Sequence, residues 1–232
     1  MPELTPIEWE ALRLSLRVAF WSVLFSLPLA IAVAWVLARR EFYGKMLLNA
    51  LVHLPLILPP VVTGYILLLL LGTKGPVGSW LQSALGIVVA FKWTGAAIAA
   101  GVMGFPLMVR AIRLSMEAVD RKLEQSAATL GASPLAVFAT VTLPLILPGI
   151  LAGTILAFAK GLGEFGATIT FVSNIPGETR TLPIAIYTFL QIPGGEEGAI
   201  RLTVIAIVLS IAALLVSEIL AKRSARRVQG DA

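Results

Sequence analysis

Long apolar stretches separated by short polar segments run along most of this chain. A helix needs about 20 apolar residues to cross the roughly 30 Å hydrocarbon core of a membrane. Five stretches reach or approach this length, and we predict spanning helices at about residues 15–38, 46–73, 92–113, 134–159 and 200–221. The pattern therefore predicts an all-α, polytopic integral membrane protein with one transmembrane domain over residues 1–232.

Two further apolar stretches are interrupted by glycine and proline. In residues 75–91, large apolar side chains such as Trp80 and Leu85 recur at helical spacing among polar ones. Residues 181–195 are too short to span a membrane and contain Pro183 and Pro193, which we expect to break a helix. We expect both stretches to form surface or re-entrant segments.

The composition agrees with a lipid environment. Hydrophobic residues make up 58% of the 232 positions and charged residues 13%, whereas a soluble domain carries about 25% charged residues. The chain has no cysteine and one histidine, His53, so disulfides, thiolate metal sites and histidine clusters lack the residues they need. We therefore expect no metal site, no bound cofactor and no catalytic residues on this chain.

The positive charges gather in the segments between the predicted spans, which favours a role in membrane orientation over nucleic-acid binding. With five spans, one side of the membrane collects most of the 18 basic residues, namely Arg39, Arg40, Lys45, Arg110, Arg113, Arg121, Lys122, Lys222, Arg223, Arg226 and Arg227. Since loops rich in Lys and Arg remain in the cytoplasm, we predict that the N-terminus lies outside and the C-terminus inside.

A polar segment between the third and fourth predicted spans, residues 117–134, carries signals for a short helix and a sharp turn. Asp120 is a good N-cap, Gly131 suits a left-handed position after the helix, and Ser133 followed by Pro134 starts another helix. On the cytoplasmic side, such a hairpin is accessible to soluble partners. The alternative is an ordinary connection between two spans.

The same segment resembles the coupling loop of type I ABC importer permeases, whose pattern is E-A-A-x3-G-x9-I-x-L-P. The matching positions are Gln125, Ser126, Ala127, Gly131, Val141, Leu143 and Pro144. Gln125 replaces the acid of the pattern, and Glu124 stands just before it. The resemblance implies that Glu124 and the matching residues couple the chain to ABC ATPase subunits, two copies of which would bind a homodimer. The chain itself has no G-x4-G-K-[S/T] loop to hold ATP phosphates.

Four other stretches, residues 53–60, 105–110, 161–168 and 173–181, are similar to molybdate permeases. Permeases for sulfate, thiosulfate and tungstate are close relatives and remain alternatives. The resemblance implies an importer of the bacterial inner membrane that works by alternating access, with an external oxyanion-binding protein as partner. A secondary transporter is the alternative from another class, although the predicted spans have few of the ionisable groups that such proteins place at mid-membrane.

Candidate residues for the translocation path lie near the outer end of the fourth span. Thr154, Thr168, Thr170 and Asn174 offer neutral hydrogen-bond donors, which suit a conduit that must release its cargo, although threonine also packs helices together. Glu164 lies one helical turn from Lys160, so we expect an ion pair or a gate there. Gly161, Gly163 and Gly166 match a dinucleotide-binding fingerprint, but they follow an apolar helix and not a strand, which argues against that function.

Overall fold

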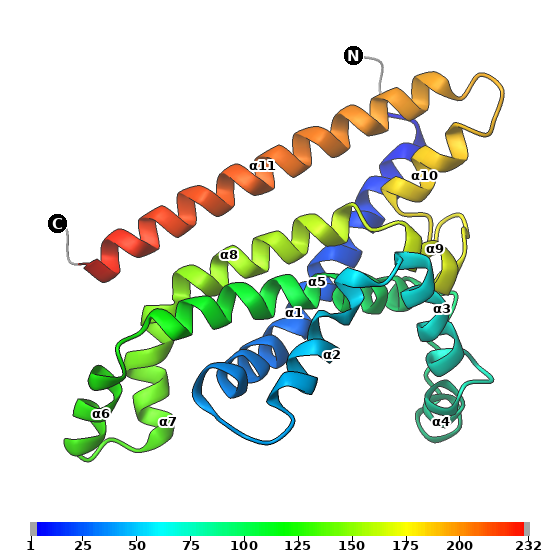
Figure 1. The fold of residues 1–232 in the computed structure, drawn as a ribbon. Helices are drawn as coiled ribbons and strands as arrows, with labels where there is room; N and C mark the ends of the chain where they lie inside the picture. The colour runs from blue at the N-terminus through cyan, green and yellow to red at the C-terminus, as the bar shows by residue number, and fades with distance from the viewer. Residues whose placement is uncertain (1–3, 230–232) are drawn as a thin grey trace.

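The computed structural model describes residues 4–229, without the side chains of 217 and 221–229, so the basic side chains from Lys222 onward lie outside the description. The described elements are helices joined by loops (Figure 1). In order they are α1 (Pro6–Arg39), α2 (Lys45–Ile57), α3 (Pro60–Leu71), α4 (Pro76–Leu85), α5 (Trp93–Ala118), α6 (Arg121–Thr129), α7 (Pro134–Val137), the π-helical turn η1 (Phe138–Thr142), α8 (Leu143–Leu162), α9 (Gly166–Val172), α10 (Leu182–Phe189) and α11 (Glu196–Gln229).

Four helical segments in the described residues are long and apolar enough to cross a membrane. They are α1, α5, the continuous segment Pro134–Leu162 formed by α7, η1 and α8, and the part of α11 from Glu196 to Leu220. These four overlap the spans predicted at 15–38, 92–113, 134–159 and 200–221. The prediction of an all-α, polytopic membrane protein is confirmed.

The predicted span at 46–73 differs from one straight helix. It consists of α2 and α3, which meet at an angle of 114°. Leu58 has φ −69° and ψ 144° at the end of α2, the extended conformation that a following proline favours. Pro59 and Pro60 also lack the N–H groups that would continue the helix. The pair counts as a fifth span only if the two bent halves cross the membrane together.

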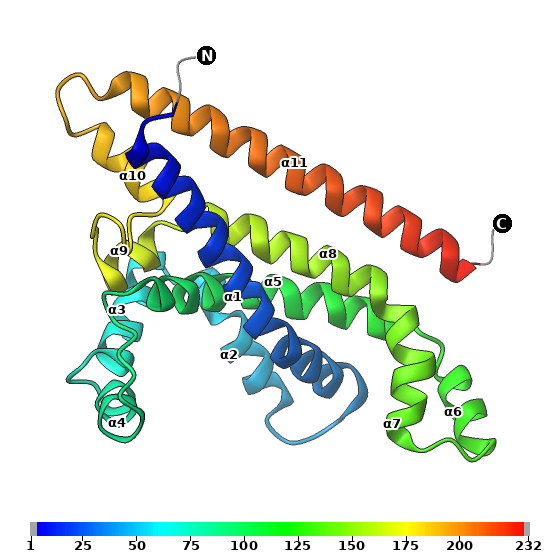
Figure 2. The same cartoon turned by 180° about the vertical axis from the view of Figure 1, so that it is seen from behind.

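Helix α5 forms the centre of the packed core, between α1 and α8 (Figures 1 and 2). Its buried face consists largely of glycine, alanine and methionine. A Cβ atom added at Gly104 would lie 3.2 Å from the Cβ of Ala157 on α8. Small residues let the two helix backbones approach closely, which is a common basis of helix association in membranes.

The connecting segments gather at two ends of the molecule. Helices α6 and α7 lie at one end, whereas α3, α9 and α10 lie at the other, near the beginnings of α1 and α11 (Figures 1 and 2). We expected Pro183 to break a helix in residues 181–195, but this segment contains α10. Pro183 lies in the first turn of α10, where its missing N–H is tolerated. Helix α4 extends from α3 and exposes Trp80 and Leu85.

Candidate coupling loop and translocation path

The hairpin of α6 and α7 has the caps that its sequence predicts. The Asp120 carboxylate accepts a hydrogen bond from the Lys122 N–H at 2.9 Å, and the Ser133 hydroxyl accepts one from the Ala136 N–H at 3.3 Å. Between the two helices, Gly131 has φ +89°, a conformation that side-chain-bearing residues rarely adopt. The caps predicted at Asp120 and Ser133 and the left-handed glycine are confirmed.

The hairpin exposes apolar side chains. None of the residues of α6 is buried, and Leu123, Leu130 and Leu135 are 51%, 89% and 77% exposed. Gln125 and Ser126 are also exposed, while Ala127 is half-buried. The hairpin therefore presents three exposed leucines at one end of the molecule.

Three of the residues matched to the coupling pattern lie away from this hairpin, and the first of them, Val141, lies in η1. Leu143 and Pro144 form the first turn of α8, after the π-helical turn η1. Leu143 is half-buried and packs against the core around α1 and α5. Both residues therefore belong to the membrane helix that follows the hairpin.

Glu124 is directed toward its own chain, which the sequence pattern did not indicate. Its Oε1 atom lies 3.0 Å from the Nη2 of Arg39 at the end of α1 and accepts a hydrogen bond from the Thr142 hydroxyl at 2.7 Å. The Glu124 side chain is 20% exposed and the Arg39 side chain 9%. Both partners are distant in sequence, so no local spacing could have identified them.

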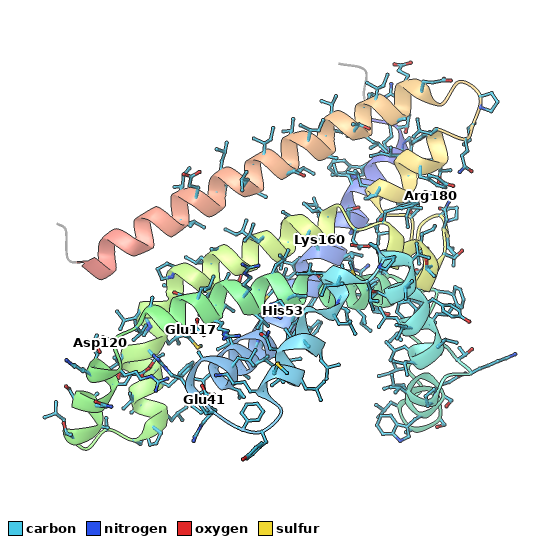
Figure 3. The ribbon with its side chains drawn as sticks, in the orientation of Figure 1. Glu41, His53, Glu117, Asp120, Lys160 and Arg180 are labelled. Carbon is cyan, nitrogen blue, oxygen red and sulfur yellow. The ribbon has the colours of Figure 1, made fainter. Side chains whose placement is uncertain are left out.

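The candidate residues around Lys160 and Arg180 lie far from the hairpin. Figure 3 shows Asp120 at one end of the molecule and Lys160 and Arg180 toward the other. The predicted pair is confirmed, because the Lys160 ammonium lies 2.8 Å from the Glu164 carboxylate. Glu164 is 2% exposed and also accepts a hydrogen bond from the Ala167 N–H at 3.0 Å, in the first turn of α9. The buried carboxylate therefore has both a cation and a backbone donor.

The candidate threonines occupy different environments. The Thr170 hydroxyl donates to the Gly166 carbonyl oxygen at 2.8 Å, and Thr168 is buried at 1% exposure. Thr154 lies in the middle of α8, about three helical turns before Glu164 in the sequence. Its buried hydroxyl oxygen has no hydrogen-bond partner in the described residues. The structure therefore does not gather the three threonines into one cluster.

Asn174 belongs to a polar network that also contains two residues outside the predicted set. Its amide nitrogen donates to the Thr188 hydroxyl at 2.9 Å, and its carbonyl oxygen accepts from the Arg180 guanidinium at 2.8 Å. The preceding residue, Ser173, has φ +64° and ψ −164°, a region occupied almost only by glycine and associated with functional segments. Residues 173–181 contain one asparagine and two threonines, and an arginine among these polar residues was the available sequence signal for Arg180.

Within residues 4–229, no group of three or more His, Asp or Glu side chains is arranged to hold a metal ion.

Comparison with known proteins identifies the family. The model of the binding-protein-dependent transport system inner membrane component matches residues 16–230. The Molybdenum transport system permease protein ModB of Escherichia coli K12 is 61% identical over 97% of this chain and 98% of its own length. ModB of Haemophilus influenzae is 57% identical over 97% of this chain and 99% of its own.

A solved structure shares the fold. The bacterial ABC transporter involved in the import of the acidic polysaccharide alginate matches 94% of this chain and 80% of its own chain, with a TM-score of 0.74 and 16% identity. The matched family model and the two relatives each cover nearly the whole chain. The chain belongs to the binding-protein-dependent transport system inner membrane components and is a multi-pass permease subunit of the inner membrane.

Proposed function

We propose that this chain forms the membrane path of an ATP-driven importer for molybdate. The observation that carries the proposal is the 61% identity to a molybdenum transport permease over nearly the full length of both chains. The chemistry of the outer end is compatible with an oxyanion, since neutral side chains such as Asn174 lie beside the cationic Arg180. A transport path must bind its anion weakly enough to release it.

The proposed contact with the ATPase is the hairpin of α6 and α7. The exposed Leu123, Leu130 and Leu135 would lie against the ATPase, together with Gln125 and Ser126. Gln125 keeps hydrogen-bonding capacity without a charge, so the contact at this position would not be an ion pair. An ATPase subunit on each chain of a homodimer would draw the two hairpins together and open the outer end.

The proposed outer partner is a binding protein that delivers the oxyanion to the end formed by α9, α10 and the start of α11. The buried Glu164 carboxylate lies just beyond the end of α8 and pairs with Lys160, whose side chain is 33% exposed, and we propose that their pair is part of the outer gate. We propose that Thr154, Thr168 and Thr170 lie along the same path, where the Thr154 hydroxyl has no hydrogen-bond partner among the described residues. A homodimer of this chain would enclose one central path between its two subunits.

The test is oxyanion uptake into proteoliposomes that contain the chain, its ATPase and its binding protein. We expect molybdate uptake that requires ATP and persists in excess sulfate. Molybdate uptake abolished by sulfate would indicate a sulfate permease, and uptake without the ATPase would indicate a secondary transporter.

The same assay tests the hairpin with Gly131→Pro. Proline requires φ near −65°, whereas Gly131 has φ +89°, so the turn cannot persist. We expect ATP hydrolysis to continue while uptake falls to background. Gly44→Pro is the matched control, because Gly44 has φ +95° but lies between α1 and α2. Coupled uptake by the Gly131→Pro protein would contradict the assignment of the hairpin.

A further inference from the structure

A small, open cavity of about 310 Å³ lies where the hairpin meets the end of α1. Arg39 and Glu124, which are in direct contact, line it together with Phe138 and Thr142 of η1. The hairpin is therefore not packed continuously against the membrane helices. Beside this cavity, a few polar contacts bridge the hairpin and the membrane helices.

Three hydrogen bonds join α6 to α1 and η1. Glu124 Oε1 binds both the Arg39 guanidinium of α1 and the Thr142 hydroxyl of η1, at 3.0 and 2.7 Å. The Arg121 guanidinium donates to the Ala38 carbonyl oxygen at the longer distance of 3.4 Å. All three contacts involve a charged group, and such hydrogen bonds are roughly twice as strong as neutral ones. Because Glu124 makes the two shorter contacts, it is the main polar attachment of α6 in the described residues.

The Arg39 guanidinium uses only part of its hydrogen-bonding capacity. Its Nη2 atom binds Glu124, whereas its buried Nε atom has no partner in the described residues. An arginine fork pairs with a carboxylate most strongly through two parallel hydrogen bonds. A movement of α6 toward α1 into the cavity would let the second Glu124 oxygen meet Nε and complete the fork.

We propose that Glu124 is a positioning residue that couples the hairpin to two membrane helices at once. Through Arg39 it connects α6 to α1, and through Thr142 it connects α6 to the start of α8. Movement of the hairpin is then transmitted to both helices, and the half-formed pair with Arg39 closes when the hairpin moves inward. This inference rests on the proposed function for its consequence in transport, but the attachment itself is independent of the substrate.

Spin-label distances test the attachment without transport. The chain contains no cysteine, so labels at Tyr43→Cys and Lys122→Cys report only the separation between the α1–α2 loop and α6; both positions are exposed. Labelled chains are diluted with unlabelled ones, so that distances within one chain are measured. We expect one narrow distance distribution, and a broader one after Glu124→Ala or Arg39→Gln.

The matched control is Glu117→Gln. Glu117 pairs with Arg113 at 2.7 Å within α5, so its loss removes an ion pair near the same end without releasing α6. Unchanged distance distributions in the Glu124→Ala protein, or equal broadening in the Glu117→Gln protein, would overturn the inference.

The consequence of losing the Glu124 attachment is measured as the ratio of oxyanion uptake to ATP hydrolysis. In proteoliposomes we expect Glu124→Ala to keep ATP hydrolysis within about twofold while the oxyanion moved per ATP falls about tenfold, the size of effect that one charge-assisted hydrogen bond supplies. Thr142→Val, which keeps the ion pair, should give a smaller loss. An unchanged ratio of uptake to hydrolysis would refute the coupling role. If the wild-type chain showed no ATP-driven uptake, the proposed function would fail while the distance measurement still decided whether Glu124 attaches the hairpin.

Discussion

At the scale of single residues, Gly131 shows how a backbone conformation alone fixes a residue type. Its φ is +89°, and a Cβ atom added there would meet no other atom within 4 Å. Space therefore does not exclude a side chain at this position. The whole cost of a substitution comes from the left-handed backbone, which disfavours residues with a Cβ by about 1–2 kcal/mol.

We predict that Gly131→Ala lowers the free energy of unfolding by about 1 kcal/mol and that Gly131→Asn lowers it less, because asparagine tolerates the left-handed region better. Gly163→Ala is the control: Gly163 has φ −91°, and its nearest neighbours to an added Cβ lie at 3.9 and 4.0 Å. Thermal unfolding of the purified protein in detergent measures all three. Equal destabilisation by Ala at positions 131 and 163 would contradict the argument.

Residue-level predictions from the sequence succeeded where the interaction is local. Asp120 and Ser133 each cap the helix that directly follows them, as their positions in the sequence predict. Glu124 differs because its partner Arg39 lies 85 residues earlier in the chain. Which side chain meets a carboxylate at that separation depends on helix packing, which no short motif encodes.

At the scale of elements, the junction of α3 and α9 depends on a glycine. A Cβ atom added at Gly64 would overlap the carbonyl oxygen of Ala167 and lie 2.8 Å from its Cα. These are backbone atoms, so no side-chain movement relieves the overlap. The position of α9, which carries Thr168 and Thr170, therefore depends on close approach to α3.

We predict that Gly64→Ala destabilises the protein by about 1–3 kcal/mol, the usual cost of overpacking. Gly161→Ala serves as the control, because an added Cβ there lies 3.5 Å or more from its neighbours. It should be neutral or slightly stabilising, since alanine favours the helix. Unfolding midpoints that are equal for the two variants would show that α3 and α9 adjust without cost.

The elements also show what the sequence left undetermined. Pro28, Pro106 and Pro148 lie inside helices that continue past them, whereas Pro59 and Pro60 separate α2 from α3. Hydrophobicity alone predicted one span at 46–73. Two consecutive prolines remove two adjacent hydrogen bonds and force the preceding residue to extend, but the angle of 114° follows from what each half packs against.

At the scale of the whole molecule, one ion pair joins the first and last long helices. The Arg201 guanidinium of α11 lies 2.9 Å from the Glu8 carboxylate of α1. The Glu8 side chain is 0% exposed and Arg201 is 24% exposed. Thr5 contributes two further hydrogen bonds to the other Glu8 oxygen. The buried carboxylate therefore depends on α11 for its charge partner.

We predict that Arg201→Gln lowers the free energy of unfolding by about 3 kcal/mol, because it leaves a buried charge without its cation. Glu8→Gln combined with Arg201→Gln should recover most of this loss. Glu197→Gln is the control: Glu197 also pairs with Arg201, but it is 77% exposed, and such pairs contribute at most about 1 kcal/mol. A double variant no more stable than Arg201→Gln alone would contradict the explanation.

The pairing of Glu8 with Arg201 also sets the order in which the two helices can reach their final packing. Glu8 precedes Arg201 by 193 residues, and ribosomes add about 5–20 residues per second, so Glu8 is synthesised about 10–40 s before its partner exists. During that interval the start of α1 cannot adopt its final buried environment without an uncompensated charge. Helix α11 therefore supplies the charge partner that the start of α1 needs for burial. A nascent chain stalled before α11 would leave this N-terminal segment incompletely packed and accessible to the cell's membrane proteases.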